Sequence, residues 1–183
     1  MKRCGWVDLK DEQMIKYHDN EWGNAVHDDD KLFEILSLEI MQSGLSWKTI
    51  LHKRNYFREA FQNFVINQVK LMDNQVSTLL NNKHIIRNRL KIEAIINNAK
   101  IISNMQQVDG SFNDYLNTNL DELIKSKFQN RSYDSINAEK YLSLEMSKKM
   151  KKDGFKFIGP VVMHSFMQAV GTINGHEQFC DFR

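Results

Sequence analysis

Apolar side chains recur every three to four residues along most of the chain, which is the pattern of helices with one buried face. The clearest segment begins after the acidic run Asp28–Asp30, whose carboxylates suit a helix N-terminus, and extends to about Gly44. Ser46 is a candidate cap for the segment that follows, 46–54. Further helical segments are predicted at 56–64, 73–80, 85–107 and 138–152, and from Pro160 to about Val170, where Gly171 is a plausible stop.

One stretch lacks this pattern. Residues 117–135 are polar with no clear period, and we expect a loop there. Strand-and-turn signals are few, because the chain has eight glycines and one proline, and no linker rich in Gly, Ser or Pro is present. With 183 residues the chain fits a single domain, 1–183, so the sequence predicts a compact all-α protein.

The composition and the N-terminal residues indicate where in the cell the protein is expected. The 42% hydrophobic content argues against disorder, and the sequence has no apolar run long enough to span a membrane. The N-terminal residues are basic and are followed by acidic ones, without the apolar region of a secretory or lipoprotein signal. We therefore expect a cytoplasmic protein, in which a disulfide between its two cysteines is disfavoured.

The net charge of +2 conceals two basic segments. Residues 83–100 hold five basic side chains against Glu93, and residues 140–156 hold six against two acidic ones. Such clusters on a nearly neutral chain suggest a local anionic partner. The alternative is that each is the solvated face of an amphipathic helix.

The second basic segment has a more specific form. The helix expected to end at Lys152 is followed by a tight turn, Gly154 to Gly159, which contains Lys156, and a new helix starts at Pro160. Glycines allow a phosphate to approach the backbone closely, and the N–H groups of the turn and of the next helix would face it. This is the logic of a helix-hairpin-helix element that grips DNA phosphates, although an ordinary helix–helix corner has the same pattern.

Four potential metal ligands lie at the two ends of the chain. Cys4 and His18 are near the N-terminus, and His176 and Cys180 are near the C-terminus in a His-x-x-x-Cys spacing. Zinc prefers four such ligands in structural sites, so one ion would join the two ends. The alternatives are a Cys4–Cys180 disulfide and four unrelated residues.

A glutamate and several aromatic residues suggest a binding pocket. Glu39 flanks the apolar stripe of its helix, where a carboxylate either reaches water or is buried with a function. All three tryptophans precede residue 48, close to Tyr17. Aromatic planes with one carboxylate suit a flat cationic ligand such as a nucleobase extruded from DNA, whereas the simpler reading is that the tryptophans are core.

These residues belong to longer motifs, and through them the whole chain resembles the DNA-3-methyladenine glycosylase I family. Two motifs are highly specific to that family, the block Tyr17-His18-Asp19-Asn20-Glu21-Trp22-Gly23 and the block Gly44-Leu45-Ser46-Trp47. Shorter matches are Cys4-Gly5-Trp6, Leu32-Phe33-Glu34, Leu38-Glu39, Ile85-Ile86-Arg87, Lys91-Ile92, Gly154-Phe155-Lys156-Phe157-Ile158-Gly159 and Ser165-Phe166-Met167-Gln168-Ala169.

The resemblance implies a fold and an activity. It implies the all-α fold of the helix-hairpin-helix glycosylase superfamily, and excision of 3-methyladenine from alkylated double-stranded DNA to leave an abasic site. It also implies a structural zinc ion that joins the N- and C-terminal segments through Cys4, His18, His176 and Cys180. We expect a monomer that contacts DNA through Lys152, Gly154, Lys156 and Gly159.

The resemblance assigns the pocket as well. The family's base-recognition residues fall on Glu39, Tyr17 and Trp47, with Trp6 and Trp22 lining the pocket, and the residue that wedges into the DNA stack falls on Leu45. The family lacks the catalytic aspartate of most relatives with this fold. Methylation at N3 makes adenine cationic and its glycosidic bond labile, so a site that binds the flipped base needs no strongly activated nucleophile.

Three features depart from the family pattern. Met14 and His164 stand where aromatic residues are usual, and segment 112–137 matches poorly.

Two other functions compete with the glycosylase. One is a non-catalytic DNA-binding module, against which the intact Glu39, Tyr17 and Trp47 argue. The other is a nucleobase or nucleotide binder with no role on DNA, against which the basic hairpin argues.

Overall fold

The computed structural model describes residues 1–108, 110–128 and 136–183, and no strand occurs among them. The nine α-helices of this part are α1 (Glu12–Asn20), α2 (Asp29–Gln42), α3 (Trp47–Ala60), α4 (Ile66–Val69), α5 (Val76–Asn81), α6 (Arg89–Val108), α7 (Phe112–Phe128), α8 (Ile136–Lys152) and α9 (Pro160–Ala169). Two short 3₁₀ turns, Gln62–Phe64 and Asp73–Gln75, connect α3 to α4 and precede α5. The all-α prediction is confirmed.

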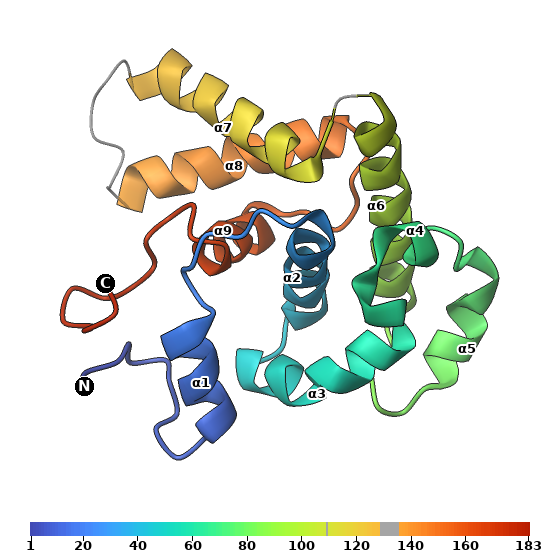
Figure 1. The fold of residues 1–183 in the computed structure, drawn as a ribbon, viewed down its shortest axis with the longest axis horizontal. Coiled ribbons are helices and arrows are strands. Elements are labelled where there is room, and N and C mark those ends of the chain that lie inside the picture. Colours follow the sequence, from blue (N-terminus) through green and yellow to red (C-terminus); the bar gives the residue numbers. More distant parts are fainter. Residues whose placement is uncertain (109, 129–135) are drawn as a thin grey trace.

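Helix α2 is the central element, and α3, α6, α7 and α9 pack around it (Figure 1). Phe33, Leu36 and Ile40 are fully buried on it and form part of the main hydrophobic core. Its N-cap is Asp28, whose carboxylate accepts a hydrogen bond from the Lys31 N–H, as the acidic run predicted. None of the described helices is long and apolar enough to cross a membrane.

Several predicted boundaries are confirmed and others shift. Ser46 caps α3, and Pro160 opens α9 with Gly159 as its N-cap. The segments predicted at 46–54 and 56–64 are one helix as far as Ala60, because its apolar face continues through Phe57. The helix predicted from residue 85 begins only at Arg89.

The loop predicted over 117–135 is wrong for most of its length, because α7 occupies Phe112–Phe128; residues 129–135 lie outside the described part. Leu116, Leu120, Leu123, Ile124 and Phe128 all pack against the core, on a stripe that the polar residues between them obscured. The helix start is held from elsewhere in the chain, since the Asp29 carboxylate of α2 accepts from the N–H of Phe112 at 2.9 Å.

The two termini lie near each other at one side of the molecule (Figure 1). Their backbones pair, because the Asp181 N–H donates to the Lys2 carbonyl at 3.0 Å. The N-terminal segment and α1 form a second, smaller hydrophobic cluster with the C-terminal residues, which includes Cys4, Tyr17 and Cys180. This cluster joins the ends of the chain beside α3.

Candidate active site and metal centre

A cavity of about 390 Å³ opens between the smaller cluster and the helices of the main core. Its lining comes from the N-terminal segment, α1, the ends of α2 and α3 that face each other, and α9. The residues are Trp6, Asp8, Met14, Tyr17, Trp22, Glu39, Gln42, Ser46, Trp47, Lys48, Ser165 and Gln168. The five residues that the sequence assigned to a base pocket, Glu39, Tyr17, Trp47, Trp6 and Trp22, are therefore brought together.

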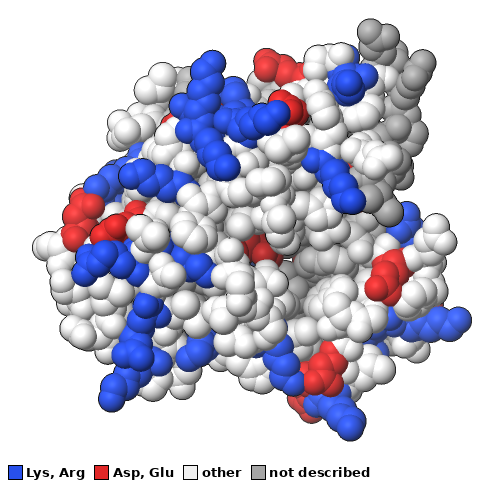
Figure 2. All heavy atoms as spheres, turned by 180° about the vertical axis from the view of Figure 1, so that it is seen from behind, with Lys and Arg blue, Asp and Glu red and all other residues white. Residues whose placement is uncertain are grey.

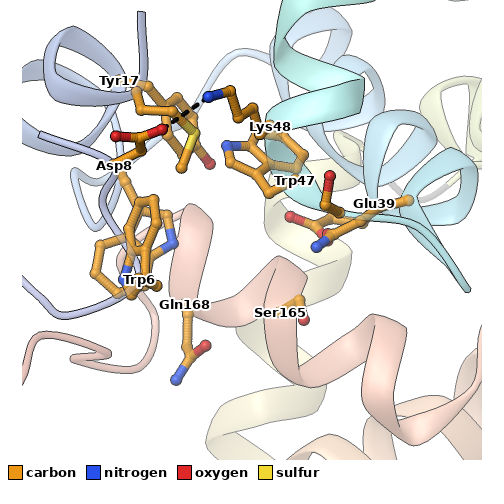
Figure 3. A pocket seen from close by; sticks show the side chains of 12 residues that line it. Trp6, Asp8, Tyr17, Glu39, Trp47, Lys48, Ser165 and Gln168 are labelled. Carbon is orange, nitrogen blue, oxygen red and sulfur yellow. Dashed lines mark hydrogen bonds and ion pairs between the residues drawn. The ribbon is translucent and has the colours of Figure 1, made fainter. Parts of the chain in front are cut away.

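Aromatic rings form the walls of this cavity (Figure 3). The rings of Tyr17 and Trp47 are 4.9 Å apart at an angle of 42°, and those of Trp6 and Trp22 meet edge to face at 5.0 Å. The indole N–H of Trp47 is buried and has no hydrogen-bond partner within the described residues. The walls thus offer flat apolar faces and one unused donor.

Glu39 supplies the buried carboxylate of this cavity. Within the described chain, this carboxylate forms no hydrogen bond and no ion pair. The residue is 5% exposed. Burial alone raises the pKa of Glu39 to about 8, because no neighbouring cation or donor stabilises the charged form. A buried acid without a protein partner is costly, and such groups mark sites where a ligand supplies the partner.

Tyr17 lies close to this acid. Burial raises the pKa of its phenol well above the ordinary range, and the charge of Glu39 adds to that effect. The hydroxyl therefore stays protonated and is available as a donor. It makes no hydrogen bond to the rest of the described chain.

An ion pair spans the cavity rim. The Lys48 ammonium at the start of α3 binds the Asp8 carboxylate at 2.7 Å and also lies 3.3 Å from that of Asp11 (Figure 3). These contacts attach the N-terminal segment to α3. The turn before α3 carries Leu45, which is 43% exposed and is not among the residues that line the cavity.

The four predicted metal ligands form a buried cluster. The donor atoms of Cys4, His18, His176 and Cys180 all lie within 4.8 Å of one another, so the group could hold a metal ion. Cys180 Sγ is 3.5 Å from His18 Nε2 and 3.4 Å from His176 Nδ1. Burial raises the pKa of the Cys4 thiol to about 11, so a cation is what would stabilise its thiolate.

Neighbouring groups orient this cluster. His18 Nδ1 lies 2.8 Å from Asp19 Oδ1, and Asp19 in turn accepts two short hydrogen bonds from the Arg3 guanidinium. This carboxylate leaves Nε2 of the imidazole facing the other three ligands, which is the usual arrangement behind a metal-binding histidine. The cluster also touches the cavity wall, because the His176 ring packs on Trp22 with centroids 4.7 Å apart.

The predicted hairpin lies between α8 and α9. Gly154 has φ of +95°, a conformation that side chains rarely adopt, and no side chain caps the N-terminus of α9. Lys152 and Lys156 are exposed beside the turn, and Gly159 has open space around its Cα. Figure 2 shows a face that is hollowed near its centre, with Lys and Arg side chains gathered around the hollow.

The chain is similar to known proteins along nearly its whole length. A profile of the family described as methyladenine glycosylase matches residues 6–183. The chain belongs to the methyladenine glycosylase family. It is 40% identical to DNA-3-methyladenine glycosylase 1 of Escherichia coli K12 over 181 residues, which cover 98% of this chain and 96% of that protein.

Solved structures of the methyladenine glycosylase family share the fold. A crystal structure of 3-methyladenine DNA glycosylase I superposes with a TM-score of 0.84 at 39% identity and covers 98% of each chain. The Staphylococcus aureus enzyme, solved to explain its recognition of 3-methyladenine, superposes with a TM-score of 0.82 at 32% identity, covering 100% of this chain and 96% of that one.

Some parts of this glycosylase-family site were not foreseen from the sequence. Asp8, Gln42, Lys48, Ser165 and Gln168 also line the cavity, and the Ser-Phe-Met-Gln spacing on α9 was the only available signal for the last two. Lys91, counted with the basic segment 83–100, points inward instead of facing a partner, and is 5% exposed. Met14, which we expected to differ from the family pattern, lines the cavity.

Proposed function

We propose that this protein is a monofunctional DNA glycosylase that hydrolyses the N-glycosidic bond of 3-methyladenine in alkylated double-stranded DNA. The observation that carries the proposal is the unpaired carboxylate of Glu39, buried at an aromatic cavity large enough for one nucleobase. A structural protein would gain stability by pairing or removing that acid. A base with an exocyclic amine and a positive charge would give it both a donor and a counter-charge.

The chemistry follows from the charge of the damaged base. A flipped 3-methyladenine would enter the cavity as a cation, stack on Trp47 and Tyr17, and donate its amine to Glu39. The positive base would lower the pKa of Glu39 from its raised value, so the acid would ionise when the substrate binds. Cleavage releases a neutral base, and the labile bond makes an activated nucleophile unnecessary.

The same arrangement selects among methylated bases. Guanine presents O6, an acceptor, at the position of the adenine amine, and an acceptor facing a carboxylate is repelled. 7-Methylguanine should therefore be a poor substrate. Trp6 and Trp22 complete the wall, and Tyr17 supplies a second polar contact.

The metal proposed for the four-ligand cluster is zinc. Tetrahedral zinc, with bonds of about 2.3 Å to sulfur and about 2.0–2.1 Å to nitrogen, sets these ligands about 3.5 Å apart. The distances from Cys180 Sγ to the two imidazoles, 3.5 and 3.4 Å, fit that geometry, as does the 3.6 Å from Cys4 Sγ to His176 Nδ1. With four protein ligands the ion would be structural, holding the aromatic wall and joining both ends of the chain.

DNA would be held on either side of the cavity. Lys152, Gly154, Lys156 and Gly159 of the hairpin are proposed to bind backbone phosphates, and Leu45 is proposed to fill the gap left by the flipped nucleotide. We propose that the protein acts as a cytoplasmic monomer. Affinity for DNA should then fall steeply with salt, because phosphate contacts dominate it.

Chromatography of bases released from methylated duplex DNA tests this function. The wild-type protein should release free 3-methyladenine, and Glu39→Gln should release it more than about 100-fold more slowly, as expected when a buried charged hydrogen bond to the reacting group is lost. Glu93→Gln, which changes an exposed carboxylate on α6, is the matched control. Tight DNA binding without release would favour the non-catalytic module instead, and undiminished release by Glu39→Gln would remove its assigned role.

A further inference from the structure

Lys91, near the start of α6, is a buried lysine that forms no ion pair with the rest of the described chain. Its Nζ donates to the carbonyl of Met41 at 2.9 Å and to that of Ser43 at 2.6 Å. Burial lowers the pKa of Lys91. Burying an ammonium without a counter-ion is costly in free energy, so its contacts point to a specific role for this side chain.

The two carbonyls belong to the C-terminal end of α2. Met41 is in its last turn and Ser43 is its C-cap, where carbonyls lack helical partners and carry the negative end of the helix dipole. The chain leaves this point through Gly44, at φ of +81°, into Leu45. Lys91 therefore fixes the point from which the Leu45 turn, residues 43–46, departs.

The same ammonium also contacts the hairpin. It lies 5.7 Å from the ring centroid of Phe157, at the tip of the 154–159 turn. Phe157 has φ of +61°, a conformation that is strained for a bulky side chain and persists only where its surroundings hold it. The ring caps the charge of Lys91 and is itself held near it.

A second residue of α6 holds the hairpin more firmly. Asn98 is fully buried, and its side chain forms two hydrogen bonds to the backbone of Lys156. Oδ1 accepts from the Lys156 N–H at 2.8 Å, and Nδ2 donates to the Lys156 carbonyl at 3.1 Å. Lys91 and Asn98 are seven residues apart, which is two helical turns and places them on one face of α6. One rigid helix face thus holds both the Leu45 turn and the hairpin.

We propose that Lys91 is a positioning residue, which keeps the Leu45 turn in register with the hairpin so that both engage DNA around one flipped nucleotide. The inference rests on the proposed function, in which the hairpin grips phosphates and Leu45 fills the gap. Lys91 is buried and does not line the cavity, so it would not contact the base or DNA directly. It acts through placement, and a misplacement of about 1 Å can reduce a rate about 100-fold.

Insertion of Leu45 can be measured without catalysis. The probe is a duplex with a tetrahydrofuran abasic-site analogue and 2-aminopurine in the opposite strand, whose fluorescence rises when the stack is opened. Wild type, Lys91→Met, Leu45→Ala and the double variant form a cycle, since methionine keeps the apolar stem and removes the ammonium. Lys100→Met is the control, because it removes a half-exposed charge of α6 that pairs with Asp73 in the 3₁₀ turn before α5.

Lys91→Met should reduce the fluorescence rise as much as Leu45→Ala does, and the double variant should be no worse than Leu45→Ala alone. Excision of 3-methyladenine should fall about tenfold or more, while affinity for the free base stays within about twofold, because the pocket is unchanged. Lys100→Met should match wild type. Effects that multiply in the double variant, or a wild-type fluorescence rise in Lys91→Met, would overturn the proposal.

Two further results distinguish the role of Lys91 from a folding defect and from the proposed function. If Lys91→Met does not fold, Phe157→Leu decides: it keeps an apolar contact but lacks the ring, and it should reduce the fluorescence rise about two- to threefold. An unchanged signal in that variant would overturn the proposal. If wild type opens the probe but releases no 3-methyladenine, the proposed function fails while the positioning role of Lys91 stands.

Discussion

Two buried glutamates on α2, five residues apart, have the same exposure and opposite surroundings. Glu34 and Glu39 are each 5% exposed. Burial would raise the pKa of Glu34, but Arg54 and Arg58 outweigh it and lower that pKa to about 2. Glu39 has no such partner, and burial raises its pKa to about 8. Accessibility alone cannot tell a structural acid from a functional one; the partners of each carboxylate do.

The contrast separates two regions of the molecule. Around Glu34 the chain supplies every partner: the Arg54 Nε–Glu34 Oε1 distance is 2.9 Å and the Arg58 Nε–Glu34 Oε1 distance is 2.8 Å, which ties α2 to α3. Around Glu39 the chain supplies a cavity and leaves the acid unpaired. The first region is complete without a ligand, whereas in the proposed function the damaged base would supply the partner that the second lacks.

The largest expected effect concerns the cluster of Cys4, His18, His176 and Cys180 beside the cavity wall, where we propose a zinc ion. Cys180→Ala should lose the metal and about 5 kcal/mol or more of unfolding free energy, because metal binding contributes directly to folding. Thermal unfolding with metal analysis measures both. Phe179→Ala, an exposed neighbour that is not a ligand, is the control. Wild-type stability in the metal-free variant would contradict a structural metal.

Glu34→Gln should come next in size. It leaves Arg54 buried without its main counter-charge, which should reduce the free energy of unfolding by about 4 kcal/mol at pH 7. Since the pKa of Glu34 is lowered on folding, its contribution is complete above pH 4.5 and is lost as the pH falls towards 2. Urea unfolding at several pH values checks this, and a variant as stable as wild type would remove the contrast.

Glu39→Gln should change stability in the opposite direction. The pKa of Glu39 is raised on folding, so its stability contribution is complete below pH 4.5 and is lost as the pH rises to about 8. The variant should therefore exceed wild type by about 4 kcal/mol at pH 8 and match it at pH 4. The same urea titration measures it; a destabilised Glu39→Gln protein would mean that the acid is paired in the free enzyme.

Tyr17→Phe should have the smallest effect on stability. Its hydroxyl makes no hydrogen bond within the described chain, so the free energy of unfolding should stay within about 0.5 kcal/mol of wild type. Excision should still slow about tenfold if the hydroxyl binds the base. Single-turnover release of 3-methyladenine separates the two, and an unchanged rate would limit Tyr17 to its packing role.

Local signals in the sequence predicted most of the fold. Asp28, Ser46 and Pro160 mark helix starts through chemistry confined to one turn, and the structure confirms all three. Helix α7 could not be predicted in this way, because its N-terminus depends on Asp29, more than 80 residues away. Helix α1 was missed although Asp11 caps it with the same chemistry as Asp28.

The residues of the candidate site also fall into a predicted and an unpredicted group. Residues with distinctive chemistry were predicted: Glu39 and the tryptophans line one cavity, and the four candidate metal ligands form one buried cluster. The contacts of Lys91 and Asn98 could not be predicted, because a lysine or asparagine on a helix gives no indication of which distant carbonyls it will bind. The ion pairs of Glu34 could not be predicted either, because Arg54 and Arg58 lie on the next helix.

The most direct measurement is a carbon NMR titration of glutamate side chains, with Glu34→Gln and Glu39→Gln to assign the two resonances. Glu39 should titrate near pH 8 in the free protein, and Glu34 should stay ionised down to about pH 2. Addition of 3-methyladenine should move the Glu39 resonance and leave that of Glu34 unchanged. A Glu39 that titrates near its ordinary value of 4.5, or that does not respond to the base, would contradict the role given to it here.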